Sequence, residues 1–387
     1  MNTQNAASPR RRAVLKALAG TALAAPMLGR TAGATGAPIR IGLSAPLTTA
    51  FAEDGKWMRQ GAELAIKEIN AAGGIKGRPL QLFVEDDQGP NPTAAANAAT
   101  KLISEDKVLA IVGPHFTPGI LAVEPLLKQY HVPAFSGATG PVVTAQGNPY
   151  VFRVRLNDNV GARLLVRYAV EKLHWTDIGI DYVNTAFGQG GLGALKAALA
   201  EMHIQPKMVQ THLDSTKDFT PQLLAFKSAG VKNLFIWTDD QPMGLINKQI
   251  KTLGLSFGIA GNAGLTLPNV IALAGDAVNG AYSIGEFIAD NPDPVVREWV
   301  KRYHAAYGAD PELYGSVYYD ATKILGDAMQ RATAIDGAAI QEALTKTRSF
   351  RGVVTTYTWS PGGDMVHSAL ITRDENKKPV IIEKVTD

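Results

Sequence analysis

Residues 39–74 read IRIGLSAPLTTAFAEDGKWMRQGAELAIKEINAAGG, and their hydrophobic pattern changes part-way along. The first five, Ile39 to Leu43, form a short β-branched run that predicts a strand. Apolar residues then recur at helical spacing, and the pair Gly73-Gly74 predicts the end of that helix; these residues are Met58, Ala62, Ala65, Ile66 and Ile69. A strand followed by a helix is the repeating unit of α/β proteins.

The same alternation continues along most of the chain. Further strands are predicted at 80–84, 109–112, 132–135, 150–154, 178–182, 209–211 and 234–237. Helices are predicted near 93–104, 118–130, 159–173, 188–202, 218–229 and 242–252. This rhythm predicts mainly parallel sheets flanked by helices. The pattern restarts near residue 176, which favours two similar lobes over one wide sheet. After residue 290 the pattern is helical, with helices at 314–332 and 337–346 and final strands near 368–372 and 379–383.

Composition excludes several classes of protein. The 387 residues contain no Cys, which excludes disulfides, zinc–cysteine sites, iron–sulfur clusters and thiol nucleophiles. The first 34 residues carry five of the 38 basic residues and no acid, so the remainder has 33 basic against 35 acidic residues, a net charge of −2. That balance lacks the basic footprint of a protein that binds nucleic acid or an anionic membrane.

The N-terminus has the features of an export signal. Arg11-Arg12-Ala13-Val14-Leu15-Lys16 resembles the twin-arginine motif, a weakly apolar stretch runs to Leu28, and Ala32-Gly33-Ala34 is a small-residue cleavage site. We therefore predict a signal peptide over residues 1–34, cleaved near Ala34, and a periplasmic mature protein.

A glycine motif offers an alternative of another class. Gly188 to Gly193 match G-x-G-x-x-G and open a predicted helix, which is compatible with an exported nucleotide-dependent enzyme. However, residues 184–187 separate the strand from the first glycine, whereas a dinucleotide-binding turn follows its strand immediately. The other interpretation is a helix start that packs closely beside a cleft.

Enzyme chemistry finds little support elsewhere. Ser136 lacks the G-x-S-x-G context of a nucleophile elbow, and the seven histidines show no metal-ligand spacing. We predict no catalytic residue, no metal and no cofactor.

Two small-residue turns follow neighbouring strands and point to an anion site. In the turn after 109–112, Thr117 is a candidate N-cap and Pro118 fits the first helical position. The next strand ends in a turn over 136–140 that can present amides and a hydroxyl. Since ligands bind at the carboxyl ends of parallel strands, the two turns together could hold one small carboxylate. The alternative is two ordinary helix caps.

Over residues 38–387 the chain resembles the periplasmic solute-binding proteins of ABC transporters, of the leucine/isoleucine/valine-binding type. The resemblance rests on the order and spacing of short pieces: 71–78, 85–87 with Pro92, Gly113-Pro114, 136–139, 187–190 and 273–277.

The resemblance implies a two-lobed type I periplasmic binding protein fold with a three-segment hinge. Lobe 1 would be 38–156 and 287–358, and lobe 2 would be 157–286 and 359–387. Such a protein, expected to be a monomer, captures a small-molecule solute and delivers it to an ABC permease in the inner membrane without altering it.

The resemblance also implies site residues. Thr117, Ala138 and Thr139 match the carboxylate-binding positions, and Phe187 matches an aromatic that closes over the ligand from lobe 2. His115 and Ser136 lie in the same two turns and complete the candidates of lobe 1.

Two departures leave the ligand open. Asp54 stands where amino-acid binders often have an aromatic, and no acid occurs over 261–263, where the ligand's ammonium would be met. Asp239 and Asp240 could substitute, or could simply cap a helix before Pro242. We rank a small carboxylate-bearing solute first, an amino acid ahead of other kinds. An aromatic or aliphatic acid or an amide, for uptake or for sensing, is the alternative.

Overall fold

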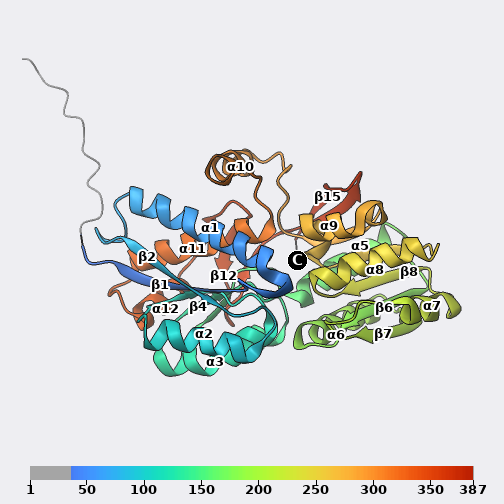
Figure 1. Ribbon diagram of the computed structural model, residues 1–387, viewed down its shortest axis with the longest axis horizontal. Helices are drawn as coiled ribbons and strands as arrows, with labels where there is room; N and C mark the ends of the chain where they lie inside the picture. The colour runs from blue at the N-terminus through green and yellow to red at the C-terminus, as the bar shows by residue number, and fades with distance from the viewer. Residues whose placement is uncertain (1–35, 387) are drawn as a thin grey trace, which may run out of the picture.

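The computed structural model describes residues 36–386, which form two α/β lobes side by side (Figure 1). Lobe 1 contains a sheet of five strands in the order β2-β1-β3-β4-β5, each parallel to its neighbours. The strands are β1 (Ile39–Ala45), β2 (Leu80–Asp86), β3 (Ile111–Val112), β4 (Ala134–Ser136) and β5 (Val151–Arg153).

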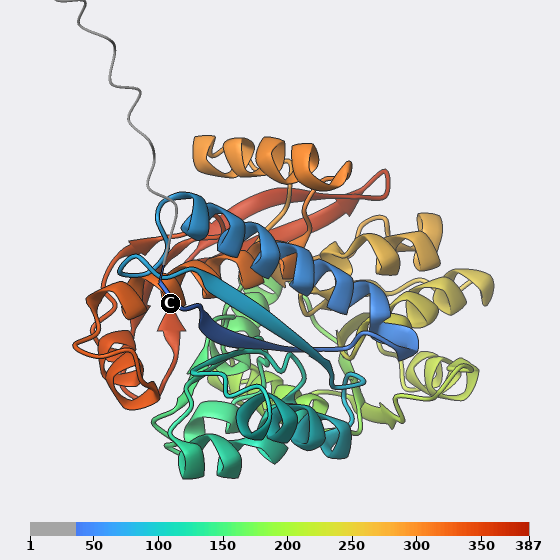
Figure 2. The same ribbon diagram turned by 60° about the vertical axis from the view of Figure 1, so that its left-hand side comes forward.

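Helices cover both faces of this sheet. Figure 2 shows α1 on one side of β1 and β2, and α2 and α3 on the other. The residues of α1 and α11 pack into one hydrophobic core and those of α2 and α3 into a second. The helices of this lobe are α1 (Ala52–Ala71), α2 (Pro92–Ser104), α3 (Thr117–Tyr130), α4 (Val142–Ala145), α10 (Pro294–Tyr307), α11 (Leu313–Arg331) and α12 (Gly337–Thr345), with a 3-10 turn η1 (Thr49–Phe51).

Lobe 2 contains a sheet of seven strands in the order β15-β14-β10-β9-β8-β6-β7. Strands β6 to β10 are parallel, whereas the C-terminal hairpin β14–β15 joins the sheet antiparallel to β10. The strands are β6 (Ile178–Val183), β7 (Met208–His212), β8 (Asn233–Trp237), β9 (Gly258–Gly261), β10 (Tyr282–Gly285), β14 (Ala369–Glu375) and β15 (Lys378–Val385).

The helices of lobe 2 also lie on both faces of its sheet. α5 and α6 pack into one core, and α7, α8 and α9 pack into the hydrophobic core that also contains α1 and α11. These helices are α5 (Asp158–Glu171), α6 (Ala186–Glu201), α7 (Thr220–Ser228), α8 (Asp240–Thr252) and α9 (Pro268–Ala274), with 3-10 turns η2 (Ala263–Thr266) and η3 (Gly275–Val278). No helix within residues 36–386 has the length and apolar character to cross a membrane.

The predicted α/β architecture of two mainly parallel sheets is confirmed. Helix α1 ends as predicted, since Gly73 and Gly74 both adopt positive φ just after it. The sequence prediction missed β9 and β10, which are only four residues long and contain glycine. It also missed a small sheet of β11 (Phe350–Arg351), β12 (Thr356–Trp359) and β13 (Met365–Val366).

Two of the three expected crossovers between the lobes lie in connections between elements, and one lies inside a strand. Those at 156–157 and 286–287 lie in connections, after β5 and after β10. The third, at 358–359, falls inside β12. The lobe boundaries over 38–156, 157–286, 287–358 and 359–387 stay predictions. The predicted signal peptide, 1–34, lies outside the described residues.

Candidate functional site

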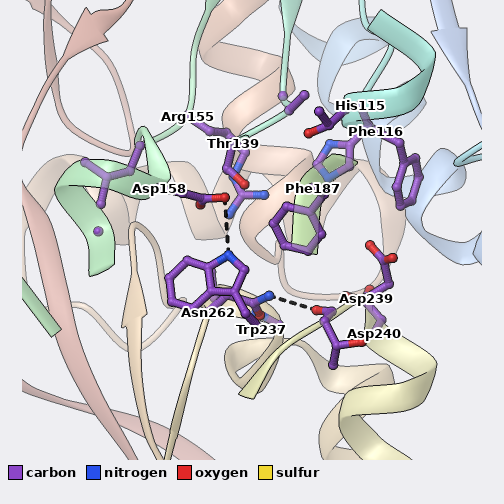
Figure 3. A pocket seen from close by; sticks show the side chains of 18 of the residues that line it. His115, Phe116, Thr139, Arg155, Asp158, Phe187, Trp237, Asp239, Asp240 and Asn262 are labelled. Atoms are coloured by element: carbon purple, nitrogen blue, oxygen red, sulfur yellow. Dashed lines mark hydrogen bonds between the residues drawn. The ribbon is translucent and has the colours of Figure 1, made fainter. Parts of the chain in front are cut away.

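A cavity lies between the two lobes, at the carboxyl ends of strands from both sheets. Lobe 1 contributes the turns after β3 and β4, and lobe 2 contributes the segments after β6, β8 and β9. Figure 3 shows the side chains that converge on it. Open α/β sheets bind ligands at this edge. The cavity therefore has the position of a ligand site.

Thr117 lines the cavity but does not cap its helix. The N-cap of α3 is Phe116, and Thr117 is the first helical residue, so the predicted capping role is wrong. Its side chain is 2% exposed, and Oγ1 has no hydrogen-bond partner among the described residues. An unsatisfied buried hydroxyl is unfavourable, and a ligand in the cavity would supply the missing partner.

Ser136 connects the two turns instead of facing the cavity. Its Oγ donates to the Pro114 carbonyl (2.7 Å) and accepts from the Ala138 N–H (3.1 Å). Ser136 does not belong to the cavity lining, whereas Ala138 and Thr139 do. Because the Ala138 amide is already paired, this turn does not present it freely, contrary to the prediction.

Asp158, which sequence reasoning missed, lies beside Thr139. The Trp237 Nε1–H donates to Asp158 Oδ2 at 3.2 Å, the contact dashed in Figure 3. Burial raises the pKa of Asp158 to about 6, although hydrogen bonds from Thr139 and Trp237 act in the opposite direction. The first residue of α5 thus places a carboxylate against the turn that was expected to hold an anion.

Arg155 is the only lysine or arginine in the described lining, and it is already paired. Its Nε lies 2.9 Å from Glu286 Oε2, and the guanidinium lies over the Tyr314 ring at 5.5 Å. Burial alone would raise the pKa of Glu286, but the Arg155 charge holds it below its ordinary value. The pair leaves no free cation on the wall to meet a ligand carboxylate.

Asp239 and Asp240 form an acidic wall where α8 begins, and both line the cavity. Asp239 occupies the N-cap position of α8, yet its side chain makes no capping bond. Burial, and next the neighbouring Asp214 and Asp240, raise the pKa of Asp239 well above its ordinary value. Capping therefore does not explain Asp239.

Asp54 lies behind this wall rather than in the cavity lining. The Asn269 amide donates to Asp54 Oδ1 (3.4 Å) and to Asp240 Oδ2 (3.5 Å), which places the two carboxyl groups together across the lobes. Burial, and next the charges of Asp240 and Glu312, raise the pKa of Asp54 well above its ordinary value. The expected direct contact of Asp54 with a ligand stays a prediction, because Asp54 is not among the residues that line the cavity.

Aromatic rings complete the site. Phe187 comes from the start of α6, as expected, and His115 packs edge-on against Phe116 and Tyr314 with centroids 5.1 and 4.3 Å away. Burial, and next the Arg155 charge, hold the pKa of His115 well below its ordinary value. Sequence reasoning missed Trp237 and Tyr314, which local patterns mark only as core residues.

The glycine motif lies inside a helix, and part of it serves packing. α6 begins at Ala186, before Gly188, so the glycines lie within the helix rather than in a turn before it. A side chain at Gly188 would collide with the Val183 carbonyl, and one at Gly191 would collide with the Trp237 ring. Gly188 and Gly191 thus let α6 approach β6 and β8, and a side chain at Gly190 would meet Pro141, whereas Gly193 has open space around it and close packing does not explain it.

The family follows from comparison with known proteins. A model described as periplasmic binding protein matches residues 38–378. The chain belongs to this family. A Leu/Ile/Val-binding protein homolog from Brucella melitensis is 29% identical over 357 residues, covering 91% of this chain and 94% of the relative.

No group of three or more His, Cys, Asp or Glu within 36–386 could hold a metal ion.

Solved periplasmic binding proteins share its architecture. A leucine-binding protein from Thermotoga maritima has a TM-score of 0.83 at 26% identity, covering 90% of this chain and 99% of that one. A solute-binding protein of an ABC transporter from Rhodopseudomonas palustris, solved with 3,4-dihydroxybenzoic acid, has a TM-score of 0.82 at 22% identity, covering 90% and 97%. At 22% identity, the similarity to the Rhodopseudomonas palustris protein shows a shared fold only. The two-lobed type I fold expected from the sequence is confirmed.

Proposed function

We propose that this periplasmic binding protein is the solute-binding subunit of an ABC importer. It captures a small carboxylate-bearing solute between its lobes, an amino acid ahead of other kinds, and delivers it unaltered to a permease in the inner membrane. The relatives named for leucine, isoleucine and valine support uptake of an amino acid. Export through the signal at residues 1–34 would place the protein in the periplasm.

One observation carries the proposal: Thr117 lines the interlobe cavity, and its buried hydroxyl lacks a partner within the described chain. It belongs to lobe 1, while Phe187, Asp239 and Asn262 face the same cavity from lobe 2. A solute that touches both lobes stabilises only their closed arrangement, so binding shifts the population toward closure.

An aromatic acid is the second candidate, because a relative of the same fold was solved with 3,4-dihydroxybenzoic acid. Phe116, Phe187 and Trp237 would suit its ring. The acidic wall opposes it, since an acid without an ammonium group brings a further negative charge. A role in sensing rather than uptake would use the same cavity and differ only in the partner.

The test is to identify the solute and its fate. Purified protein is denatured, and the released small molecules are identified by mass spectrometry. The recovered solute should rebind at one site per chain in calorimetry, reduce the radius of gyration in solution scattering, and be recovered unchanged. A modified product formed over many turnovers per protein would refute the proposal in favour of an enzyme.

A further inference from the structure

The cavity wall carries more acidic than basic side chains. Its lining contains four carboxylates, Asp158, Asp239, Asp240 and Glu286, against the single guanidinium of Arg155. That guanidinium is bound to Glu286. Asp158, Asp239 and Asp240 therefore line the cavity without an ion pair among the described residues, although the charges of Arg153 and Arg155 act on Asp158 and that of Arg155 acts on Asp240. Burying charge without a counter-ion is unfavourable.

Of these three carboxylates, Asp239 is the clearest case of a buried acid without a partner. It is 8% exposed, and its carboxylate has no hydrogen bond within the described residues. Further acids surround it: Asp214 and Asp240 are close enough to act on its charge, and Asp54 lies behind Asp240. An unpartnered carboxylate on the wall of a cavity is matched by a cation that enters with the ligand.

Asp158 forms a second anionic point. Figure 3 shows it on the opposite side of Phe187 from Asp239. The rings of Phe187 and Trp237 lie along the same cavity. Aromatic faces attract cations and also accept the methylene chain that connects two charged groups.

Thr117 is a second, independent feature that points to a ligand site here. Its buried, unpartnered hydroxyl belongs to lobe 1 and can donate to a carboxylate. The cavity thus offers one donor for an anion and two separate anionic points for cations.

We propose that the solute is a basic amino acid, whose α-ammonium lies near Asp158 and whose side-chain ammonium or guanidinium is held by Asp239 and Asp240. The inference rests on the proposed function and names the ligand class of the same site. It sets this chain apart from a binder of aliphatic side chains, because a hydrocarbon end would leave Asp239 buried and unpaired.

The test compares L-lysine with L-norleucine, which has the same chain length but no ε-ammonium. L-arginine, L-leucine and benzoate complete the calorimetric panel. L-lysine or L-arginine should bind at least about tenfold more tightly than L-norleucine, because hydrogen bonds to charged groups are strong. Asp239→Asn should remove most of this preference. Asp276→Asn, which makes the same charge change on the exposed surface of lobe 2, should preserve it.

The possible failures are distinguishable. If L-norleucine or L-leucine binds as tightly as L-lysine, the inference is wrong and the proposed function stands. If none of the five compounds binds, the inference is wrong, and the solute recovered from purified protein decides the proposed function separately. If Asp239→Asn does not fold, the comparison of L-lysine with L-norleucine on the unaltered protein still decides.

Discussion

The Arg155 guanidinium and the Glu286 carboxylate form a buried ion pair with Nε and Oε2 2.9 Å apart. Arg155 follows the last strand of the lobe 1 sheet, and Glu286 follows β10 of the lobe 2 sheet. Glu286 also accepts from the Leu156 N–H. The pair therefore joins two of the segments that are predicted to connect the lobes, and both residues line the interlobe cavity.

Glu286→Gln should destabilise the protein strongly, because it leaves the Arg155 cation buried without its anion. Removing one partner of a buried pair costs about 3–5 kcal/mol. Urea unfolding measures the change. Glu375→Gln is the matched control, since its pair with Arg373 is exposed and should be worth less than about 1 kcal/mol. Equal losses in the two variants would show that the Arg155–Glu286 pair has no special role.

Thr117→Val should weaken solute binding by about tenfold or more without lowering the free energy of unfolding. Charge-assisted hydrogen bonds are worth roughly 1.5–3 kcal/mol, and the hydroxyl has no partner within the described protein to lose. Thr139→Val should also weaken binding, since Thr139 supports Asp158. Calorimetry with the recovered solute measures both. Thr100→Val, on the exposed side of α2, is the control. Unchanged affinity in Thr117→Val would show that the carboxylate binds elsewhere.

The affinity for L-lysine should fall as the pH is lowered from 7.5 to 5. Burial raises the pKa values of Asp158 and Asp240 to about 6, so below that pH the empty site holds protons on these groups. An ammonium group binds the ionised carboxylates and must expel those protons, whereas L-lysine keeps its own charges throughout this range.

Several groups share in this titration. The groups that face Asp240 are Asp54, Asp239, Asn269, Glu312, Tyr314 and Arg155. The groups that face Asp158 are Thr139, Trp237, Arg153 and Arg155. Calorimetry at pH 5, 6 and 7.5 in buffers of different ionisation enthalpy measures both affinity and proton release. Affinity that stays constant, or binding without proton release near pH 6, would contradict the prediction.

Replacing Arg11 and Arg12 together by lysine should abolish the periplasmic pool of the protein. The pair precedes a weakly apolar segment and a small-residue cleavage site, which is the pattern of a twin-arginine signal. Cell fractionation measures the effect, and Arg30→Lys, outside the motif, serves as control. The mature protein should begin near Thr35. Undiminished periplasmic protein in the double variant would rule out this export route.

Local patterns in the sequence were sufficient for the α/β alternation, the end of α1 and the two turns beside the cavity. These features depend on periodicity, turn chemistry and helix-starting residues within about ten positions, all of which are visible in a linear chain. The turn at Thr117 was found in this way, although the helix begins one residue earlier than predicted.

Only the tertiary structure decided what each polar group of the site can do. Ser136 bonds to Pro114 and Ala138 instead of facing the cavity, and Asp54 meets Asp240 from the other lobe. Asp158 accepts a hydrogen bond from Trp237, which lies 79 positions away in the sequence. Side-chain direction and charge state depend on neighbours that folding brings together from distant parts of the chain. For that reason the sequence, through its family resemblance and its turns, predicted a binding protein with an anion-friendly turn, whereas only the fold showed that acidic side chains line the same cavity.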